Sequence, residues 1–252
     1  MSKSRRNWSR EELIVTFNLY CKLPFSKINY RHELVIKLAN AINRTPSAVA
    51  WKLVNFASLD PSLRKEGIKG ATNVSKLDRQ IFNEFTENWE ELILESEKLL
   101  NNFFNLRNES VEVENSLEGL DKFYLTKSRI NQSFFRKMIL SSYNNECCLT
   151  GLDTITLLVA SHIVPWSNDS KNRLNPHNGL CLNYLHDRAF DKGLITFDEK
   201  YKLLLSLDLK KSKNKSIQHN FQDLESKPLK LPGKFLPSQD FLEFHRNTIF
   251  KG

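Results

Sequence analysis

A group of polar side chains able to do acid–base or metal chemistry lies in the second half of the sequence: His162, Asn178, His186, Asp187 and Asp191. Imidazole accepts and releases protons near neutral pH. Carboxylate oxygens are preferred ligands of hard divalent cations. Brought to one point, these groups can hold one cation and activate one water.

The surrounding residues predict the elements that would bring them together. "TLLVAS" predicts a strand that reaches His162, and Pro165 turns the chain away. A loop rich in Asn, Asp, Ser and Pro follows, then "GLCL" predicts a returning strand and "NYLHDRAF" a short helix. Because paired strands bring their ends together, His162, Asn178 and the helix side chains are expected to converge. "LITFD" and "YKLLLSL" predict two further strands.

Four linked motifs between Cys147 and Asp198 resemble the HNH nuclease family. They read "CCLTG", "ASHIVPW", "NPHNGL" and "DRAFDKGLITFD", in the order found in one branch of that family. The resemblance implies a ββα-metal site that hydrolyses phosphodiester bonds in DNA. The N-terminal half also resembles the region that precedes this module in bacterial restriction-type endonucleases, although its motif is looser.

The resemblance assigns roles to the two central residues. His162 matches the general base, and its ordinary pKa lies near the working pH. Asn178 matches the middle asparagine, which is expected to orient the histidine and brace the loop. As the residue before Gly179, Asn178 also suits a turn on local grounds alone.

The metal ligands stay open at this point. Many HNH enzymes place an aspartate before the first histidine, where this chain has Ser161. Asp187 is the first choice of ligand and His186 the second. Asp191 falls on the same helix face as Asp187, where it is either a second carboxylate or a cap before Gly193. One divalent ion is expected, Mg²⁺ first and Mn²⁺ as the alternative.

The N-terminal region carries a helical pattern from Trp8 to about Asn101. Thr45 and Pro46 predict a helix start, and Ser75 with Asp78 predicts another. The apolar residues predicted to face inward are Leu13, Phe17, Tyr20, Leu34, Leu38, Ile42, Val49, Leu53, Phe56, Leu77, Ile81 and Phe85.

Three short helices with a tight turn before the third indicate a helix-turn-helix or Myb-like DNA-binding unit. Lys52 and Asn55 would then lie in a DNA groove. In the second half, Arg173 and His177 are the candidates for contacts with substrate phosphate. A plain helical bundle with a solvated basic face is the alternative for the N-terminal region.

The predicted fold class is α+β, with a helical domain at residues 1–105, a linker at 106–126 and an HNH domain with an additional β-hairpin at 127–252. The linker is placed where the chain is acidic, polar and without periodicity. The 252-residue length and 40% apolar content suffice for a sizeable core.

The net charge of +8 favours a polyanionic partner. The four cysteines include no C-x-x-C pair, so buried reduced thiols are expected rather than disulfides or a zinc knuckle. With no apolar run long enough to span a bilayer, the chain is expected to be soluble and cytoplasmic, without a membrane partner.

The sequence thus predicts a metal-dependent endonuclease acting on double-stranded DNA, in bacterial restriction or defence. A homodimer would supply the two active sites that a double-strand break calls for. Two alternatives stay open: a DNA-binding or regulatory protein whose HNH module no longer cuts, and a nuclease directed at RNA.

Overall fold

A computed structural model describes residues 6–61, 63, 74–105, 120–169 and 171–252. These residues form two compact units, Met1–Phe134 and Phe135–Gly252, and the division falls inside one helix, α7 (Leu120–Ser142). The predicted linker is therefore described only in part, because residues 120–126 belong to the start of α7 and residues 106–119 lie outside the described residues.

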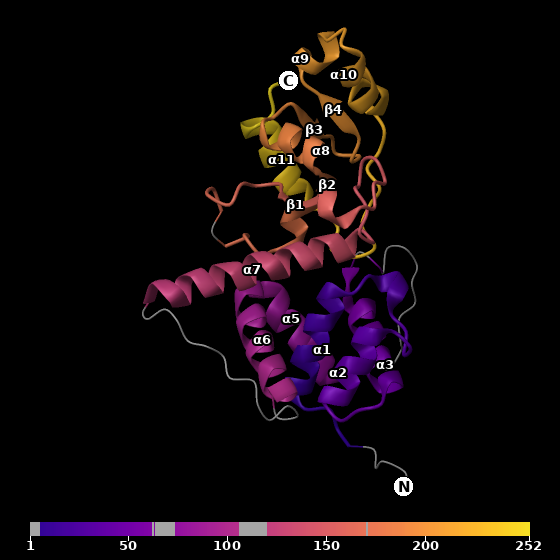
Figure 1. Ribbon diagram of the computed structural model, residues 1–252, viewed down its shortest axis with the longest axis vertical. Coiled ribbons are helices and arrows are strands. Elements are labelled where there is room, and N and C mark those ends of the chain that lie inside the picture. Colours follow the sequence, from indigo (N-terminus) through magenta and orange to yellow (C-terminus); the bar gives the residue numbers. More distant parts are fainter. Residues whose placement is uncertain (1–5, 62, 64–73, 106–119, 170) are drawn as a thin grey trace. The chain divides into compact units, whose positions relative to one another are not determined.

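The first unit is helical (Figure 1). Its elements are α1 (Arg10–Lys22), the 3-10 turn η1 (Phe25–Lys27), α2 (Glu33–Ala41), α3 (Pro46–Leu59), α5 (Lys76–Glu87), α6 (Trp89–Asn105) and the start of α7. In Figure 1, α1 lies between α5 and α6 on one side and α2 and α3 on the other. The helical N-terminal region predicted from the sequence is confirmed.

Helix boundaries in this unit follow from local capping. Thr45 accepts a hydrogen bond from the backbone N–H of Ala48 and Pro46 occupies the first turn of α3, as predicted. Ser75 and Asp78 form a reciprocal capping box at the start of α5, also as predicted.

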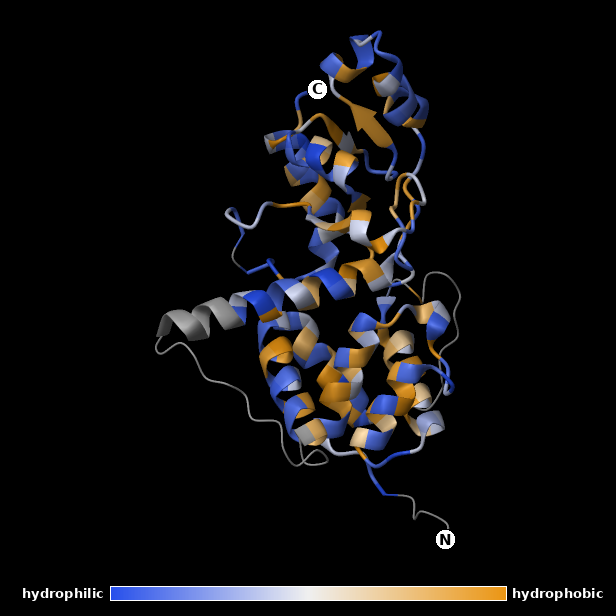
Figure 2. Ribbon diagram, in the orientation of Figure 1, coloured by the Kyte–Doolittle hydropathy of each residue, from blue (hydrophilic) through white to orange (hydrophobic). Residues whose placement is uncertain are grey.

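The core of the unit is built around Phe17, which is fully buried. Its ring lies 4.9 Å from that of Phe56, 5.5 Å from Phe82 and 6.2 Å from Trp89, measured between centroids. Aromatic rings at these separations add to the free energy gained by burial. Figure 2 shows the apolar residues of these helices concentrated where the helices face one another.

The inward-facing prediction is wrong at Leu34, whose side chain is 43% exposed. In the short helix α2 the buried stripe runs instead through Val35, Leu38, Ala39 and Ile42. This stripe keeps the helical spacing but is rotated by one position, because His32 caps the helix and Leu34 lies in its first turn on the solvent side.

Two strand pairs and several short helices form the second unit. Strands β1 (Leu158–His162) and β2 (Gly179–Asn183) pair antiparallel, and so do β3 (Ile195–Phe197) and β4 (Leu203–Leu205). The helical elements are η2 (Ile155–Leu157), η3 (Pro176–Asn178), α8 (Tyr184–Asp191), α9 (Leu207–Lys211), α10 (Lys215–Asn220), η4 (Gln222–Leu224) and α11 (Gln239–Thr248). The mixture of helices and small sheets agrees with the predicted α+β class.

α8 follows β2 directly and packs on both strands of the first pair (Figure 1). Asn183 caps α8 by accepting a hydrogen bond from the N–H of His186, so the strand turns into the helix without a loop. All four cysteines are free thiols and buried, as predicted. None of the helices in the described part of the chain has the length and apolar character needed to cross a membrane.

His245 is a buried structural residue of α11. Its ring is stacked on Phe190 with 3.7 Å between centroids, Nε2 donates to the Phe190 carbonyl oxygen, and Nδ1 accepts from the Thr196 hydroxyl. Burial lowers the pKa of His245 to about 4, because a charged imidazole would lose its hydration there.

This shift predicts a pH-dependent stability. Between pH 6.5 and about 4 the unfolded chain binds a proton that the folded chain does not. The contribution of His245 is therefore complete above pH 6.5 and is lost as the pH falls, up to about 3 kcal/mol of unfolding free energy. Urea unfolding of wild type and His245→Gln at pH 7.5, 5.5 and 4.5 measures it. An identical pH slope in both proteins would contradict the assignment.

A second stability prediction concerns Asp78, which is fully buried and binds Lys52 and Asn55 besides capping α5. Asp78→Ala removes one of the two capping-box bonds at the start of α5 and leaves a largely buried ammonium without its partner, so we expect a loss of about 3 kcal/mol in urea unfolding. The control is Glu33→Ala, which removes an exposed carboxylate from the first turn of α2 and should cost about 0.5 kcal/mol. Equal losses in the two variants would refute the role of Asp78.

Candidate active site

His162 is the last residue of β1, as the sequence predicted, and pairs with Gly179 at the start of β2. Its Nε2 lies 2.8 Å from the backbone carbonyl oxygen of Arg173. A carbonyl oxygen only accepts hydrogen bonds, so Nε2 carries the proton and Nδ1 of the neutral ring is left with its lone pair. The loop that follows β1 thus selects the tautomer of the histidine.

Two aromatic rings hold the imidazole in place. Phe135, from α7, is stacked on it with 4.1 Å between centroids and 8° between planes. Trp166 meets it edge-on at 5.5 Å. The packing keeps His162 half-buried and lowers its pKa through desolvation, although the carbonyl of Arg173 and the charge of Asp191 act in the opposite direction. The ring is therefore neutral at neutral pH.

Gly179 makes the stacking possible. A Cβ atom at this position would lie 2.3 Å from Cδ1 of Ile139 and 3.0 Å from Cζ of Phe135. A larger residue would have to displace the side chain of Ile139 and would crowd the Phe135 ring that covers His162. The glycine is required for close approach rather than for an unusual backbone angle.

Asn178 ties together both ends of the loop between the strands. Its side-chain oxygen accepts from the N–H of Val164 at 2.7 Å, and its amide nitrogen donates to the carbonyls of Val164 and Asn172 at 3.2 Å each. The residue is 1% exposed, so these bonds replace the hydration that it loses. This geometry agrees with the bracing part of its predicted role; its side chain acts on the loop rather than on the imidazole.

α8 contributes two carboxylates to this region: Asp191, which interacts electrostatically with His162, and Asp187, which interacts with the neighbouring Ser161. The pKa of Asp187 is raised, first by burial and then by the charge of Asp191, while the Ser161 hydroxyl and Arg188 act against the rise. The pKa of Asp191 is also raised, by burial, and the positive charge of Arg188 partly offsets this. Carboxylates in this state gain from a bound cation, which would neutralise their repulsion.

The hydroxyl of Ser161 is a further polar group at this place. Ser161 is 2% exposed, and its oxygen makes no hydrogen bond of normal length within the described residues. It faces the Asp187 carboxylate, on whose pKa it acts. A buried hydroxyl without a partner costs free energy unless a water or an ion completes its coordination.

The donor set fits a magnesium-type ion rather than a closed metal site. No group of three or more His, Cys, Asp and Glu side chains is arranged to hold a metal among the residues that the structure describes. Asp187 and Asp191 could supply one or two carboxylates to such an ion, and Ser161 a hydroxyl. Mg²⁺ is commonly bound in this way, since it keeps several waters and takes its other ligands from a phosphate substrate.

His186, the other candidate ligand, lies apart from this group. Its Nε2 is 2.8 Å from the carbonyl oxygen of Asn220 and its Nδ1 is 3.0 Å from the side-chain oxygen of Asn183. It is also hydrogen-bonded to Cys147, whose pKa is raised by burial but brought down to about 7 by this and further hydrogen bonds. Both ring nitrogens have protein partners, so His186 connects α8 to neighbouring segments.

The predicted substrate contacts divide between the two units. Nε of Arg173 donates to the carbonyl of Trp166, and its guanidinium lies 5.1 Å from the Trp166 ring. Nδ1 of His177 donates to the carbonyl of Leu236. Both residues belong to the loop that holds His162, whereas Lys52 and Asn55 belong to the helical unit and are bound to Asp78.

A comparison with known protein families identifies the segment that carries these residues. Residues 147–198 match the family model described as HNH endonuclease. The chain carries an HNH endonuclease domain. The matched segment contains His162, Asn178, Asp187 and Asp191, whereas Phe135, which covers the imidazole, lies outside it. A comparison with curated proteins found no match to the chain.

Phe135 was missed by sequence reasoning. It lies outside the HNH motifs, in α7, next to Phe134. Both Phe134 and Phe135 are buried, at 1% and 3% exposure. Two adjacent apolar residues just before the HNH motifs are the signal that was available.

The stacking contact leads to a prediction for the metal-free HNH domain. Phe135→Ala exposes the imidazole to water, so we expect the pKa of His162 to rise. Phe135→Tyr keeps the ring and should leave the pKa where it is. NMR titration of the histidine ring signals in EDTA measures both, and the signal of exposed His219 is the internal control. An unchanged His162 titration in Phe135→Ala would rule out this role.

Proposed function

We propose that the protein is a divalent-metal-dependent endonuclease that hydrolyses phosphodiester bonds in double-stranded DNA, in a bacterial restriction or defence system. The family match supports a nuclease acting on nucleic acid. The observation that carries the mechanism is the hydrogen bond from Nε2 of His162 to the Arg173 carbonyl, because it leaves Nδ1 free to take a proton.

In this proposal His162 is the general base. Its lowered pKa keeps the ring neutral and able to accept the proton of the attacking water at neutral pH. Stacking by Phe135 and the edge contact of Trp166 fix the direction in which Nδ1 points. Such preorganisation avoids the cost of orienting the base during the reaction.

Asp187 and Asp191 would hold the divalent ion, with Ser161 close by. When bound, the ion supplies positive charge that stabilises the 3′-oxygen leaving group. The two carboxylates stand on one face of α8, four residues apart, and α8 is anchored by the Asn183 cap. Their positions are thus set by a rigid element that continues directly from β2.

Asn178 is a positioning residue in this scheme. By holding Val164 and Asn172 it shapes the loop whose Arg173 carbonyl binds His162. Arg173 and His177 lie on the same loop, where the terminal N–H groups of the Arg173 guanidinium are suited to contacts with the phosphate backbone. His177 is the second candidate there, although its Nδ1–H already donates to the Leu236 carbonyl. Loop shape, base orientation and substrate contacts therefore depend on one buried amide.

The helical unit is proposed to bind DNA in the manner of helix-turn-helix or Myb-like domains. α2 and α3 are joined by a tight turn in which Asn43 has a φ of 55° and the N–H of Arg44 bonds the carbonyl of Ala39. The net charge of +8 over the whole chain supports attraction of the protein as a whole to the phosphate backbone.

The test uses supercoiled plasmid incubated with the purified protein in Mg²⁺, in Mn²⁺ and in EDTA, followed by separation of the topoisomers. We expect nicked or linear plasmid with metal and none in EDTA. His162→Ala should reduce the rate by about 10²- to 10⁴-fold, the contribution typical of a general base. His219→Ala, which changes an exposed histidine of α10, is the matched control and should cut like wild type.

Two outcomes would overturn the proposal. If wild type binds plasmid but does not cut it with either metal, the protein is a DNA-binding protein with an inactive HNH domain. If it cuts a single-stranded RNA but no DNA, the substrate assignment is wrong. Equal loss of cutting in His162→Ala and His219→Ala would refute the role of His162.

A further inference from the structure

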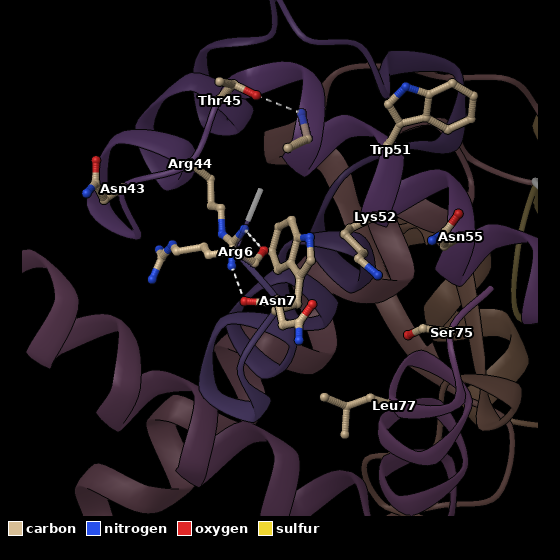
Figure 3. Close-up of a pocket in the computed structure, with 12 residues that line it drawn as sticks. Arg6, Asn7, Asn43, Arg44, Thr45, Trp51, Lys52, Asn55, Ser75 and Leu77 are labelled. Carbon is tan, nitrogen blue, oxygen red and sulfur yellow. Dashed lines mark hydrogen bonds between the residues drawn. The ribbon is translucent and has the colours of Figure 1, made fainter. Parts of the chain in front are cut away.

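A second site candidate lies in the helical unit, on the outward face of α3. A pocket of about 1010 Å³ is lined there by α3, the N-terminal segment before α1, the turn before α3 and the start of α5 (Figure 3). The α3 positions that line it, Ala48, Trp51, Lys52 and Asn55, follow helical spacing along one face. None of the described residues that line the pocket is acidic, whereas Arg6, Arg44 and Lys52 are basic.

The polar side chains of this face have partners within the protein. Nζ of Lys52 lies 2.8 Å from each carboxylate oxygen of Asp78, and the Asn55 amide donates to the same carboxylate at 3.1 Å. Lys52 is only 12% exposed in its side chain. Both side chains therefore use their N–H donors within the protein, and few donors remain for hydrogen bonds to the edges of base pairs.

Arg44 is committed in the same way. Its guanidinium binds the buried Glu12 and the backbone carbonyls of Arg6 and Asn7, as the dashed lines at Arg44 in Figure 3 show for the two carbonyls. Arg6 differs, because among the described residues only its Nη2 is used, by Glu12 and by the carbonyl of Ile42. With 52% of its side chain exposed, Arg6 keeps donors available at the edge of the pocket.

Trp51 is the conspicuous residue of the pocket. Its side chain is 63% exposed, and it makes no ring contact or hydrogen bond with the residues that the structure describes. A single exposed apolar residue is ordinary on a protein surface. Here, however, the indole borders a basic pocket whose volume is at the upper end of those of small-molecule sites.

These features match one type of ligand. A nucleobase presents a flat π-face that stacks on an exposed indole, and stacking of this kind is largely independent of base identity. A base inside a duplex exposes only its edge, and recognition of that edge requires polar side chains that are free to form hydrogen bonds. On this face Lys52 and Asn55 are already bonded to Asp78. Arg6 has the donors to bind the phosphate next to such a base.

We propose that this pocket binds one unpaired nucleotide of a DNA strand, with its base stacked on Trp51 and its phosphate bound by Arg6. The proposal rests on the proposed function in one respect, the choice of DNA as the nucleic acid. It assigns to α3 the recognition of an exposed base in place of the groove contact by Lys52 and Asn55.

The experiment is fluorescence anisotropy with labelled DNA in EDTA, so that binding is measured without cleavage. The ligands are a fully paired duplex and the same duplex with one unpaired nucleotide. We expect the full-length protein to bind the second about tenfold more tightly, within the range of free energy gained by one stacked base. Trp51→Ala should abolish this preference, and Trp51→Phe should retain part of it.

The matched control is Tyr30→Ala, which removes another half-exposed aromatic side chain from the same unit and should leave the preference unchanged. Circular dichroism melts of Trp51→Ala establish that the variant is folded, since an exposed side chain contributes little to the core. Arg6→Gln should weaken binding of both DNAs and reduce its salt dependence.

Three results would overturn the proposal: equal affinity for the two duplexes, an unchanged preference in Trp51→Ala, or tighter binding of an RNA of the same sequence than of the DNA. Failure of the nuclease assignment is seen separately. If the protein prefers the unpaired nucleotide but never cuts plasmid, the pocket assignment holds and the proposed nuclease function fails. If it cuts plasmid but binds both duplexes equally, the nuclease function holds and the pocket assignment fails.

Discussion

The antiparallel register of β1 and β2 is the constraint on which the candidate active site depends. It sets His162 opposite Gly179, so the loop between the strands begins and ends at one point. Asn178 then closes that loop twice, with its backbone carbonyl on Ile163 and its side chain on Val164. A slip of one residue would turn every side chain of the strand to the other face and separate the base from its supports.

Much of this could be predicted from the sequence because short-range rules govern it. The strand patterns and the four motifs predict which elements carry His162, Asn178 and Asp187, and these elements are short. The contact of Phe135 with His162 could not be predicted in this way. It joins a helix to a strand end through the missing side chain of Gly179, and nothing in the local pattern says which of two adjacent phenylalanines faces the site.

In the helical unit, too, local patterns predicted the helices but not the contacts between them. Its helix starts at Thr45 and Ser75 follow local capping rules, and its central aromatic cluster follows from the helical period. The functional interpretation of Lys52 and Asn55 did not take account of Asp78, a capping residue twenty-odd positions away that also neutralises the lysine. The helical period predicts which side chains lie on the outer face of a helix. Whether such a side chain is free to bind DNA depends on the charged groups that other elements place beside it.

The edge contact between Trp166 and His162 has an optical consequence. A protonated imidazole quenches the emission of a neighbouring indole by accepting an electron from it, while the neutral ring does so far less. In a variant whose other tryptophans, Trp8, Trp51 and Trp89, are replaced by phenylalanine, the fluorescence of Trp166 reports the charge on His162 without any added label. The same intrinsic signal would register the arrival of a phosphate or a cation beside the histidine in real time, and stopped-flow mixing could then separate binding of the substrate from its cleavage.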